Sequence, residues 1–312
     1  MTPTEPSGNF SSLAAVLCLE PHGPDTYVGG GPQYPFAGLY GGQVVAQALQ
    51  AAQLTVKMGY APHSLHAYFI RMGDPAEPVR FEVQRLRDGH NFIAREVVAR
   101  QSTGAILNMS ASFQAVLGEG KEWGSVPGKD APSPPPSPAD IQLQWPPAVR
   151  GPDDGKDASW SPLFEMRVVQ GSYGEAWGSA PGQSAPGQSA PGQCAPATPA
   201  WSWMRVTEQL PDEAAAHAAA LAYESDSGPA WVIGALHEAM VSPGHPWRPI
   251  RLDHAMWCHR PFRADGWLLL STSAASFRAS RGLAVGQVWS PNGVLVASVS
   301  QEVLLRRPRP TT

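Results

Sequence analysis

LDHAMWCHRPFRADGWLLLSTSAASFRASRGLAVGQVWSPNGVLVASVSQEVLLR, residues 252–306, is the stretch that decides the fold of this chain. Its last part, residues 294–306, alternates in hydropathy with the period of a β-strand. The apolar face of this strand comprises Leu295, Ala297, Val299, Val303 and Leu305, and it also carries Gln301. A buried amide without partners costs about 1–3 kcal/mol. Gln301 is therefore expected either to bond to backbone groups or to hold a water or a ligand carbonyl.

Upstream, the first half of the chain contains one predicted helix followed by four predicted strands. The helix starts at Gly41 and repeats Val45, Leu49, Ala52 and Val56 at helical spacing. The strands are predicted at 64–72, 79–87, 92–101 and 105–115, with turns at Asp88-Gly89 and Thr103-Gly104. A long helix followed by long antiparallel strands predicts an α+β fold in which the helix lies across the sheet.

Two adjacent glycines, Gly41 and Gly42, open this helix. Because they have no side chains, the first backbone N–H groups stay accessible at the positive end of the helix dipole. A carbonyl oxygen or a phosphate can approach closely there. The alternative is that the glycines only let the helix pack tightly against strands, and the sequence favours neither.

The second half of the chain repeats the first. Adding 189 to the residue number aligns residues 64–114 with residues 253–303 without a gap. In this alignment Tyr68 meets Trp257, and the turn residue Gly104 meets Gly293. The shared strand phase and turn positions predict two tandem units, each a helix on a sheet.

Two segments differ from the rest in composition. Residues 117–160 are rich in proline, which predicts a semi-rigid linker between an N-terminal unit at 10–116 and a C-terminal unit at 161–307. Within the C-terminal unit, the pentapeptide SAPGQ occurs three times in a row at 179–193. Such a repeat buries nothing, so a surface loop is expected there.

The rest of the C-terminal unit contains further predicted elements. Strands are expected at 163–169 and 201–207, and a helix at 214–223. We expect Asp212 to cap this helix, and the residues up to Asp226 to end or kink it ahead of Gly228-Pro229.

The composition excludes several classes of protein. The chain has 312 residues, of which 43% are hydrophobic and 15% charged, as is typical of a soluble globular protein with a sizeable core. The formal net charge of −4, without a basic run, argues against a nucleic-acid partner. The three cysteines form no Cys/His ligand pattern, so no metal site is expected. No apolar run reaches the ~18 residues of a membrane span.

Several blocks in the same order resemble the acyl-CoA thioesterase II family. They are LYGGQVVAQAL at 39–49, HSLHAYFIR at 63–71, GD at 73–74, LRDG at 86–89, ASFQ at 111–114, DHAMWCHRPF at 253–262, GVLVAS at 293–298 and QE at 301–302. The resemblance covers about residues 10–115 and 200–306. It implies a tandem (double) hotdog fold, each half a long helix wrapped by an antiparallel sheet. It also implies hydrolysis of acyl-CoA to free acid and CoA, without a metal or organic cofactor.

The resemblance further implies an assembly and a compartment. Hotdog sheets commonly pair edge to edge, so a homodimer or homotetramer is expected. We expect a cytoplasmic protein. Peroxisomal relatives make the peroxisome the alternative, although the last four residues, RPTT, match no peroxisomal signal.

In the family, an Asp, a Ser or Thr and a Gln hold the hydrolytic water. The Asp belongs to a Tyr-x-Ser-Asp segment at the end of the second long helix and matches Asp226, and the Gln matches Gln301. The resemblance thus implies Asp226 as general base and Gln301 as the residue that orients the water, with amides near Gly42 polarising the thioester carbonyl. The Ser or Thr position holds Arg251, whose guanidinium donates hydrogen bonds, accepts none and stays charged.

Arg251 allows three interpretations. It pairs with Asp226 and weakens the carboxylate as a base, it points away and leaves a water in place of the hydroxyl, or it binds an anionic group of the substrate. Two functions therefore stay open, an acyl-CoA hydrolase and an acyl-thioester-binding hotdog protein with weak or altered catalysis. The resemblance gives no chemical role to the remaining candidate bases, which are expected in the core or at interfaces: His63, His66, His254 and His259.

Overall fold

The computed structural model describes residues 10–34, 36, 38–116, 161–168, 199–240 and 248–306. The predicted linker at 117–160 and the SAPGQ repeats at 179–193 lie outside the described residues. The elements of the first half are α1 (Leu13–Leu17), β1 (Glu20–Pro21), β2 (Thr26–Gly29), α2 (Gly41–Gln53), β3 (Tyr60–Phe69), β4 (Val79–Asp88), β5 (Phe92–Gln101) and β6 (Gly104–Ala115). Those of the second half are β7 (Phe164–Val168), β8 (Ala200–Val206), α3 (Ala214–Ser225), α4 (Ser227–Met240), β9 (Arg248–Arg251), β10 (Asp253–Cys258), β11 (Leu268–Arg278), β12 (Arg281–Trp289) and β13 (Leu295–Arg306).

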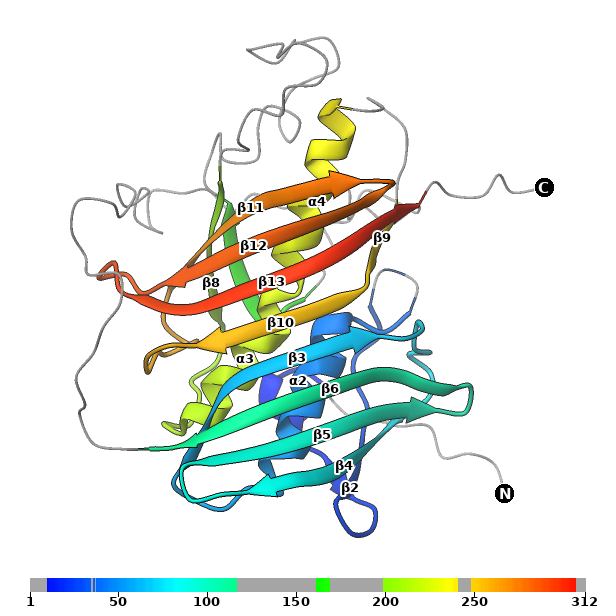
Figure 1. The fold of residues 1–312 in the computed structure, drawn as a ribbon, viewed down its shortest axis with the longest axis vertical. Coiled ribbons are helices and arrows are strands. Elements are labelled where there is room, and N and C mark those ends of the chain that lie inside the picture. Colours follow the sequence, from blue (N-terminus) through cyan, green and yellow to red (C-terminus); the bar gives the residue numbers. More distant parts are fainter. Residues whose placement is uncertain are drawn as a thin grey trace.

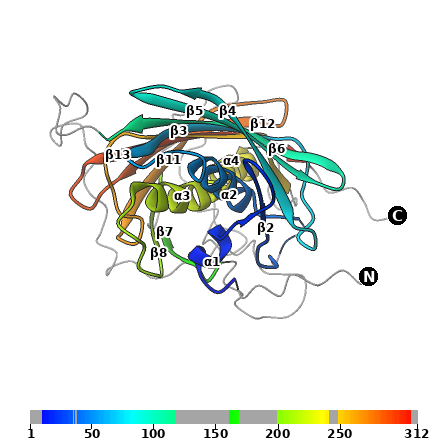
Figure 2. The ribbon, with the colours of Figure 1, turned by 90° about the horizontal axis from the view of Figure 1, so that it is seen from below.

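The strands form one continuous antiparallel sheet in which the two halves meet edge to edge. The order is β1-β2-β4-β5-β6-β3-β10-β13-β12-β11-β8-β7, and β9 pairs with β13. The two halves join where β3 pairs with β10, in the middle of the sheet in Figure 1. The three long helices lie on one face of this sheet, as the view along its edge in Figure 2 shows. The α+β tandem hotdog expected from the resemblance is confirmed.

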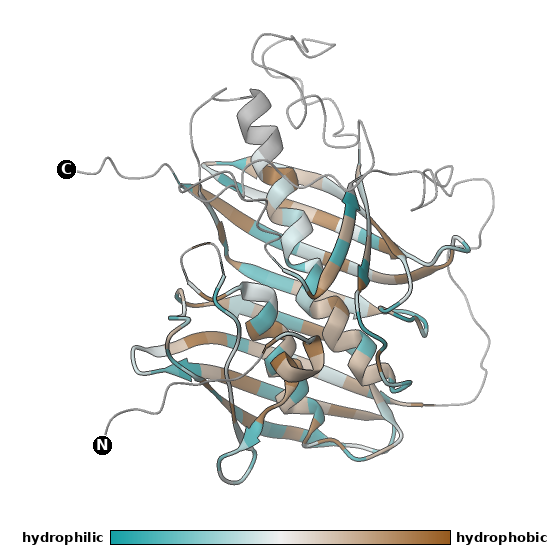
Figure 3. Ribbon diagram, turned by 180° about the vertical axis from the view of Figure 1, so that it is seen from behind, coloured by the Kyte–Doolittle hydropathy of each residue, from teal (hydrophilic) through white to brown (hydrophobic). Residues whose placement is uncertain are grey.

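Each half has its own helix across the sheet, because its part of the sheet presents one apolar face. Helix α2 packs on β3 to β6, and α4 packs on β9, β11, β12 and β13. On β12, the inward residue Gly282 leaves room for α4, since a Cβ there would lie 2.6 Å from the side chain of Ile233. Figure 3 shows the helix-covered face, with hydrophobic segments on the helices and on the strands behind them.

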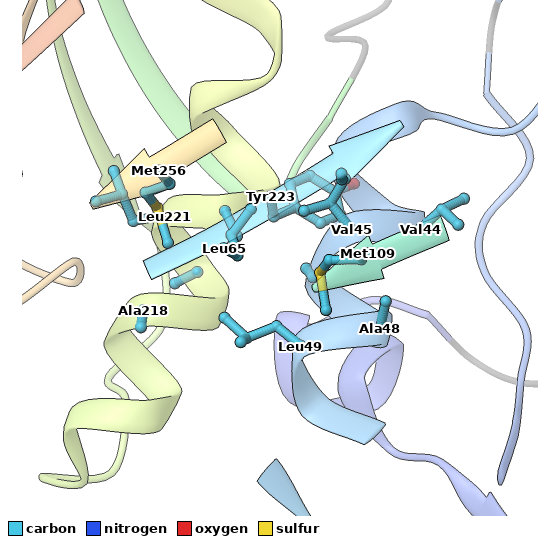
Figure 4. Close-up of a cluster of buried hydrophobic side chains, with 14 of the residues drawn as sticks. Val44, Val45, Ala48, Leu49, Leu65, Met109, Ala218, Leu221, Tyr223 and Met256 are labelled. Carbon is cyan, nitrogen blue, oxygen red and sulfur yellow. The ribbon is translucent and has the colours of Figure 1, made fainter. Parts of the chain in front are cut away.

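Among the described residues, the largest buried hydrophobic cluster contains residues of both halves, and two smaller clusters lie in the second half. Helix α3 packs against α2 and β3 of the first half, so that it bridges the two units. In the close-up of Figure 4, Leu49 of α2 and Leu221 of α3 lie in the same buried cluster as Leu65 of β3 and Met256 of β10. Within the described parts of the chain, no helix is long and apolar enough to cross a membrane.

The internal repeat is present, but the ungapped alignment is wrong for its last strand. Through β12 the shift of 189 holds, since Val97 and Gly286 occupy equivalent inward positions. Their partners on the next strand are Met109 and Val299, whose residue numbers differ by 190 instead of 189. The turn before β13 therefore has one extra residue. A shift of one residue would turn every side chain of β13 to the opposite face of the sheet.

One expectation about the second half is wrong, and one helix of the second half was not predicted. Glu213, not Asp212, is the N-cap residue of α3 and makes no side-chain cap hydrogen bond; Asp212 pairs with Arg263 instead. Helix α3 ends at Asp226, as expected, but the chain is helical again from Ser227, where the unpredicted helix α4 starts. Pro229 does not prevent this, since the N–H that proline lacks has no partner in the first turn of a helix anyway.

Candidate active site

Asp226 lies at the junction of two helices. It is the C-cap residue of α3, and α4 begins at the next residue. Asp226 therefore lies at the end of the helix predicted from the sequence, and directly before α4, the helix that crosses the sheet of the second half. The side chain is completely buried. A buried carboxylate needs partners to be stable there.

Asp226 has such partners on β13 and β9. Nε2 of Gln301 donates a hydrogen bond to its Oδ1 at 2.6 Å. Nε of Arg251 lies 2.8 Å from Oδ2 and donates to the backbone oxygen of Asp226 at 3.1 Å. The contact to Oδ2 is an ion pair without hydrogen-bond alignment. The geometry is that of the first interpretation of Arg251, pairing with Asp226, and its effect on catalysis stays a prediction.

Gln301 is fixed by the register of β13. The apolar face predicted for this strand is its inward face, and Gln301 is fully buried there. A carboxylate only accepts hydrogen bonds, so the amide must turn its NH2 group towards Asp226. Its Oε1 is then the free end of the amide, and it has no hydrogen-bond partner among the described residues. This oxygen is an acceptor beside the carboxylate.

His254 and Ser225 extend the cluster. His254 is fully buried, in line with the expected core or interface position, but neither residue had a predicted role in the site. Nε2 of His254 lies 3.1 Å from Oγ of Ser225, and its Nδ1 lies 3.5 Å from Nε2 of Gln301. The pKa of His254 is lowered, mainly by burial. The negative charge of Asp226 acts in the opposite direction, and the positive charge of Arg251 adds to the lowering. A neutral ring with its proton on Nε2 donates to Ser225 and offers Nδ1 to the second N–H of Gln301. No local pattern signals this, because the partners are far apart in the sequence.

The start of α2 brings the first half to the site. A Cβ at Gly41 would lie 2.9 Å from Oδ2 of Asp226, and a Cβ at Gly42 would lie 2.1 Å from the backbone oxygen of Tyr223. Both glycines therefore permit a close approach between the two halves. The hydroxyl of Tyr40, the N-cap residue of α2, donates to the same oxygen of Tyr223 at 2.7 Å. Of the predicted pair, Gly41 is thus next to Asp226, and Gly42 packs against Tyr223.

Glu224 is a second buried acid near the site. Its side chain is 2% exposed, and neither carboxyl oxygen has a hydrogen-bond partner among the described residues. Burial raises the pKa of Glu224 to about 8. The group is therefore mainly protonated at neutral pH. Asp226, in contrast, has a guanidinium and an amide beside it.

The described residues contain no group of three or more His, Cys, Asp or Glu side chains that could hold a metal ion. The cluster has instead one carboxylate, one amide with a free oxygen, one imidazole and one guanidinium, next to a helix start. Such a set can take a proton from a water and stabilise negative charge on an oxygen.

Comparisons with known proteins identify the family of this chain. Family models described as acyl-CoA thioesterase N-terminal and C-terminal domains match residues 31–114 and 138–305. Acyl-coenzyme A thioesterase 8 of Homo sapiens is 31% identical, over 97% of this chain and 92% of its own. Acyl-CoA thioesterase 2 of Haemophilus influenzae is 29% identical, over 95% of this chain and 98% of its own.

A solved structure extends the match to three dimensions. An acyl-CoA thioesterase II from Mycobacterium marinum is 31% identical, with a TM-score of 0.67, and the match covers 95% of this chain and 98% of that one. Matches of this extent in both halves show the family. The chain belongs to the acyl-CoA thioesterase II family, a family of thioester hydrolases.

Proposed function

We propose that this protein hydrolyses acyl-CoA thioesters to a free acid and CoA, using a water that Asp226 activates. The observation that carries the proposal is the pair of acceptors at the junction of the two halves. Asp226 is buried and ionically paired, and the free Oε1 of Gln301 lies beside it. A water has two hydrogens to donate, and these two groups accept both. The hydroxyl that the family has at the position of Arg251 is then not needed to hold the water.

The reaction follows from these contacts. The water oxygen adds to the thioester carbon while Asp226 takes one water proton, so that negative charge moves from the carboxylate to the carbonyl oxygen. Collapse of the tetrahedral intermediate breaks the C–S bond. The thiolate of CoA leaves, and Asp226 returns the proton to it. No covalent intermediate with the enzyme and no cofactor are needed, so we expect a chelator to leave the rate unchanged.

His254 supports this role of Gln301. One N–H of the amide bonds to Asp226 and the other faces Nδ1 of His254. With both hydrogens directed to these neighbours, Gln301 interacts with the water only as an acceptor. In this proposal Gln301 orients the attacking water, and a different group stabilises the oxyanion. The amides at the start of α2, near Gly42, are one such group.

The salt bridge between Arg251 and Asp226 supports a second candidate function. A carboxylate that stays paired with a guanidinium is a weaker base, so the protein then binds acyl thioesters and hydrolyses them slowly. Thiol release distinguishes the two functions. Binding of acyl-CoA without thiol release, together with a gain of activity in Arg251→Ser, supports the binding protein.

The test of the hydrolase is the release of free thiol from acyl-CoAs of increasing chain length by the wild type and by Asp226→Asn. We expect the wild type to turn over and Asp226→Asn to lose about 10²–10⁴-fold in kcat. Asp25→Asn is the matched control, because Asp25 also pairs with an arginine, Arg85, but on the surface away from the site. It should keep full activity. Equal rates for Asp226→Asn and the wild type would rule out the assigned base.

We also propose that the protein assembles as a homodimer or homotetramer, as expected for hotdog sheets. Light scattering coupled to size-exclusion chromatography measures the mass of the assembly, and a monomer would contradict this proposal.

A further inference from the structure

Arg251 has hydrogen-bonding capacity that its contacts do not use. It is the last residue of β9 and pairs with Val303, whose side chain is buried on the inward face of β13. Its polar contacts within the described residues are made by Nε, to the carboxylate and the backbone oxygen of Asp226. Among the described residues, neither terminal nitrogen, Nη1 or Nη2, has a hydrogen-bond partner. The side chain is 22% exposed, so its outer end is accessible.

The guanidinium lies beside both the carboxylate of Asp226 and the start of α2. Nε is 2.8 Å from Oδ2 of Asp226, the same oxygen that a Cβ at Gly41 would meet at 2.9 Å. Its central carbon is 5.7 Å from the ring centre of Tyr40, the N-cap residue of α2. A thioester carbonyl that lies at the helix start is therefore next to the guanidinium as well as to the carboxylate.

We propose that Arg251 is a catalytic residue that donates a hydrogen bond from a terminal nitrogen to the thioester oxygen as that oxygen becomes negative. The proposal rests on the proposed hydrolase function. When the water adds, the negative charge leaves the carboxylate and appears on the carbonyl oxygen. A cation beside both positions stabilises the charge before and after this transfer without having to move. Arg251 forms no covalent bond and keeps its protons throughout.

The contacts of the neighbouring residues explain why a donor suits this place. The two acceptors that the water needs are Asp226 and the free oxygen of Gln301, whose N–H groups already face Asp226 and His254. Within the described site, the side chain with unused donors beside the carboxylate is that of Arg251. An arginine in place of a hydroxyl thus changes the role of the position from holding the water to stabilising the oxyanion.

The experiment compares kcat and KM of the wild type with those of Arg251→Ser, Arg251→Gln and Arg251→Lys. We expect Arg251→Ser and Arg251→Gln to lose about 10²–10³-fold in kcat, with little change in KM. Arg251→Lys keeps the charge and should recover part of the loss. If Arg251→Ser is as active as the wild type or more active, Arg251 only weakens the base and the proposal is wrong.

Binding of an S-alkyl-CoA thioether, which lacks the carbonyl oxygen, separates catalysis from anchoring. Arg251→Ser should bind this analogue within about threefold of the wild type, because the missing interaction forms only in the transition state. Weaker binding in the variant would show instead that Arg251 anchors an anionic group of CoA. The same measurement confirms that each variant is folded.

A pair of substrates tests selection of an anionic acyl group. The acyl chains have equal length and end in either a methyl or a carboxylate group. The factor by which Arg251→Ser lowers kcat/KM relative to the wild type should be the same for both substrates. A loss confined to the carboxylate substrate would overturn the proposal. Asp226→Asn is assayed in parallel. A wild type without thiol release refutes the hydrolase and this proposal together, whereas an active wild type with an equally active Arg251→Ser refutes this proposal alone.

Discussion

The two halves of the molecule have the same framework but place their buried polar groups differently. One cross-strand pair shows this directly. In the first half, Arg95 of β5 pairs with Ala111 of β6; in the second half, the equivalent pair is Ala284 of β12 and Gln301 of β13. In each pair a long polar side chain faces an alanine. The long side chain is on the first strand of the pair, β5, in the first half and on the second strand of the pair, β13, in the second half.

The buried polar groups have different roles in the two halves. Arg95 is 1% exposed and its guanidinium bonds to Oγ1 and the backbone oxygen of Thr55, just beyond the end of α2. It ties a strand to the helix of its own half. Gln301 and Asp226 meet instead at the start of α2, at the boundary between the halves. The duplicated framework thus uses an inward position to hold a strand on a helix in one half and to build the proposed active site in the other.

The largest expected effect comes from Arg95→Ala, which should affect stability only. Loss of the guanidinium leaves Thr55 and two backbone oxygens without this donor and opens a cavity in the core of the first half. We expect the free energy of unfolding to fall by about 3–5 kcal/mol. Denaturant unfolding measures this loss.

Activity is the control for Arg95→Ala. Below its melting temperature the variant should keep the kcat of the wild type, because Arg95 has no contact with the site. A large loss of kcat in the folded variant would show that the division between a structural and a catalytic half is wrong.

The next effect comes from Glu224→Gln and depends on pH. Unfolded Glu releases its proton near pH 4.5, whereas burial keeps Glu224 protonated up to about pH 8 because its folded pKa is raised to that value. The folded state therefore binds more protons between these values, and the free energy of unfolding falls as pH rises through them. At 1.36 kcal/mol per pKa unit, Glu224 destabilises the protein by about 3 kcal/mol at pH 7.

Glutamine is neutral at every pH and removes this penalty. Glu224→Gln and the wild type should unfold at similar denaturant concentrations at pH 5, and the variant should be more stable by about 3 kcal/mol at pH 7. Denaturant unfolding at pH 5, 6 and 7 measures the difference. A difference that does not change with pH would mean that Glu224 ionises in the folded protein.

The smallest expected effect in free energy comes from Gln301→Ala, which gives β13 the residue of the equivalent first-half position. The attacking water loses one of its two acceptors, so kcat should fall by about 10–100-fold, or about 1.4–2.7 kcal/mol, with little change in KM. Free-thiol release measures the loss.

Gln47→Ala is the matched control for this prediction. Gln47 is also a fully buried glutamine, but it donates to the backbone oxygens of Val16 and Gly30 within the first half. Its removal should lower stability and leave kcat intact. Equal losses of kcat in both variants would indicate that a buried amide matters only for folding.

The framework was predictable from the sequence because its signals are local. Alternation identified the inward face of β13, including Gln301, and the apolar spacing after Gly41 identified α2. Helix α4 was missed, since Gly228-Pro229 is typical of a helix end but here occupies the first turn of a helix. The one-residue shift of β13 was also missed, because an extra turn residue leaves the strand pattern unchanged.

The site was predictable only in part. The resemblance supplied Asp226 and Gln301, and the structure brings them within hydrogen-bond distance. Pairing of Arg251 with Asp226 was one of three interpretations, because side-chain direction is not encoded in strand alternation. The contacts of His254 with Ser225 and Gln301 join positions distant in the sequence, so they follow only from the packing of β10 against the α3–α4 junction.

The central claim, that Asp226 activates a water rather than attacking the substrate itself, is tested most directly by a single turnover in ¹⁸O-labelled water. Excess enzyme is mixed with acyl-CoA, and the acid product and the peptide containing Asp226 are analysed by mass spectrometry. If a water attacks the thioester carbon, one ¹⁸O atom appears in the acid and none in Asp226. If the label appears in Asp226 and the acid is unlabelled, Asp226 is the nucleophile and the account is wrong.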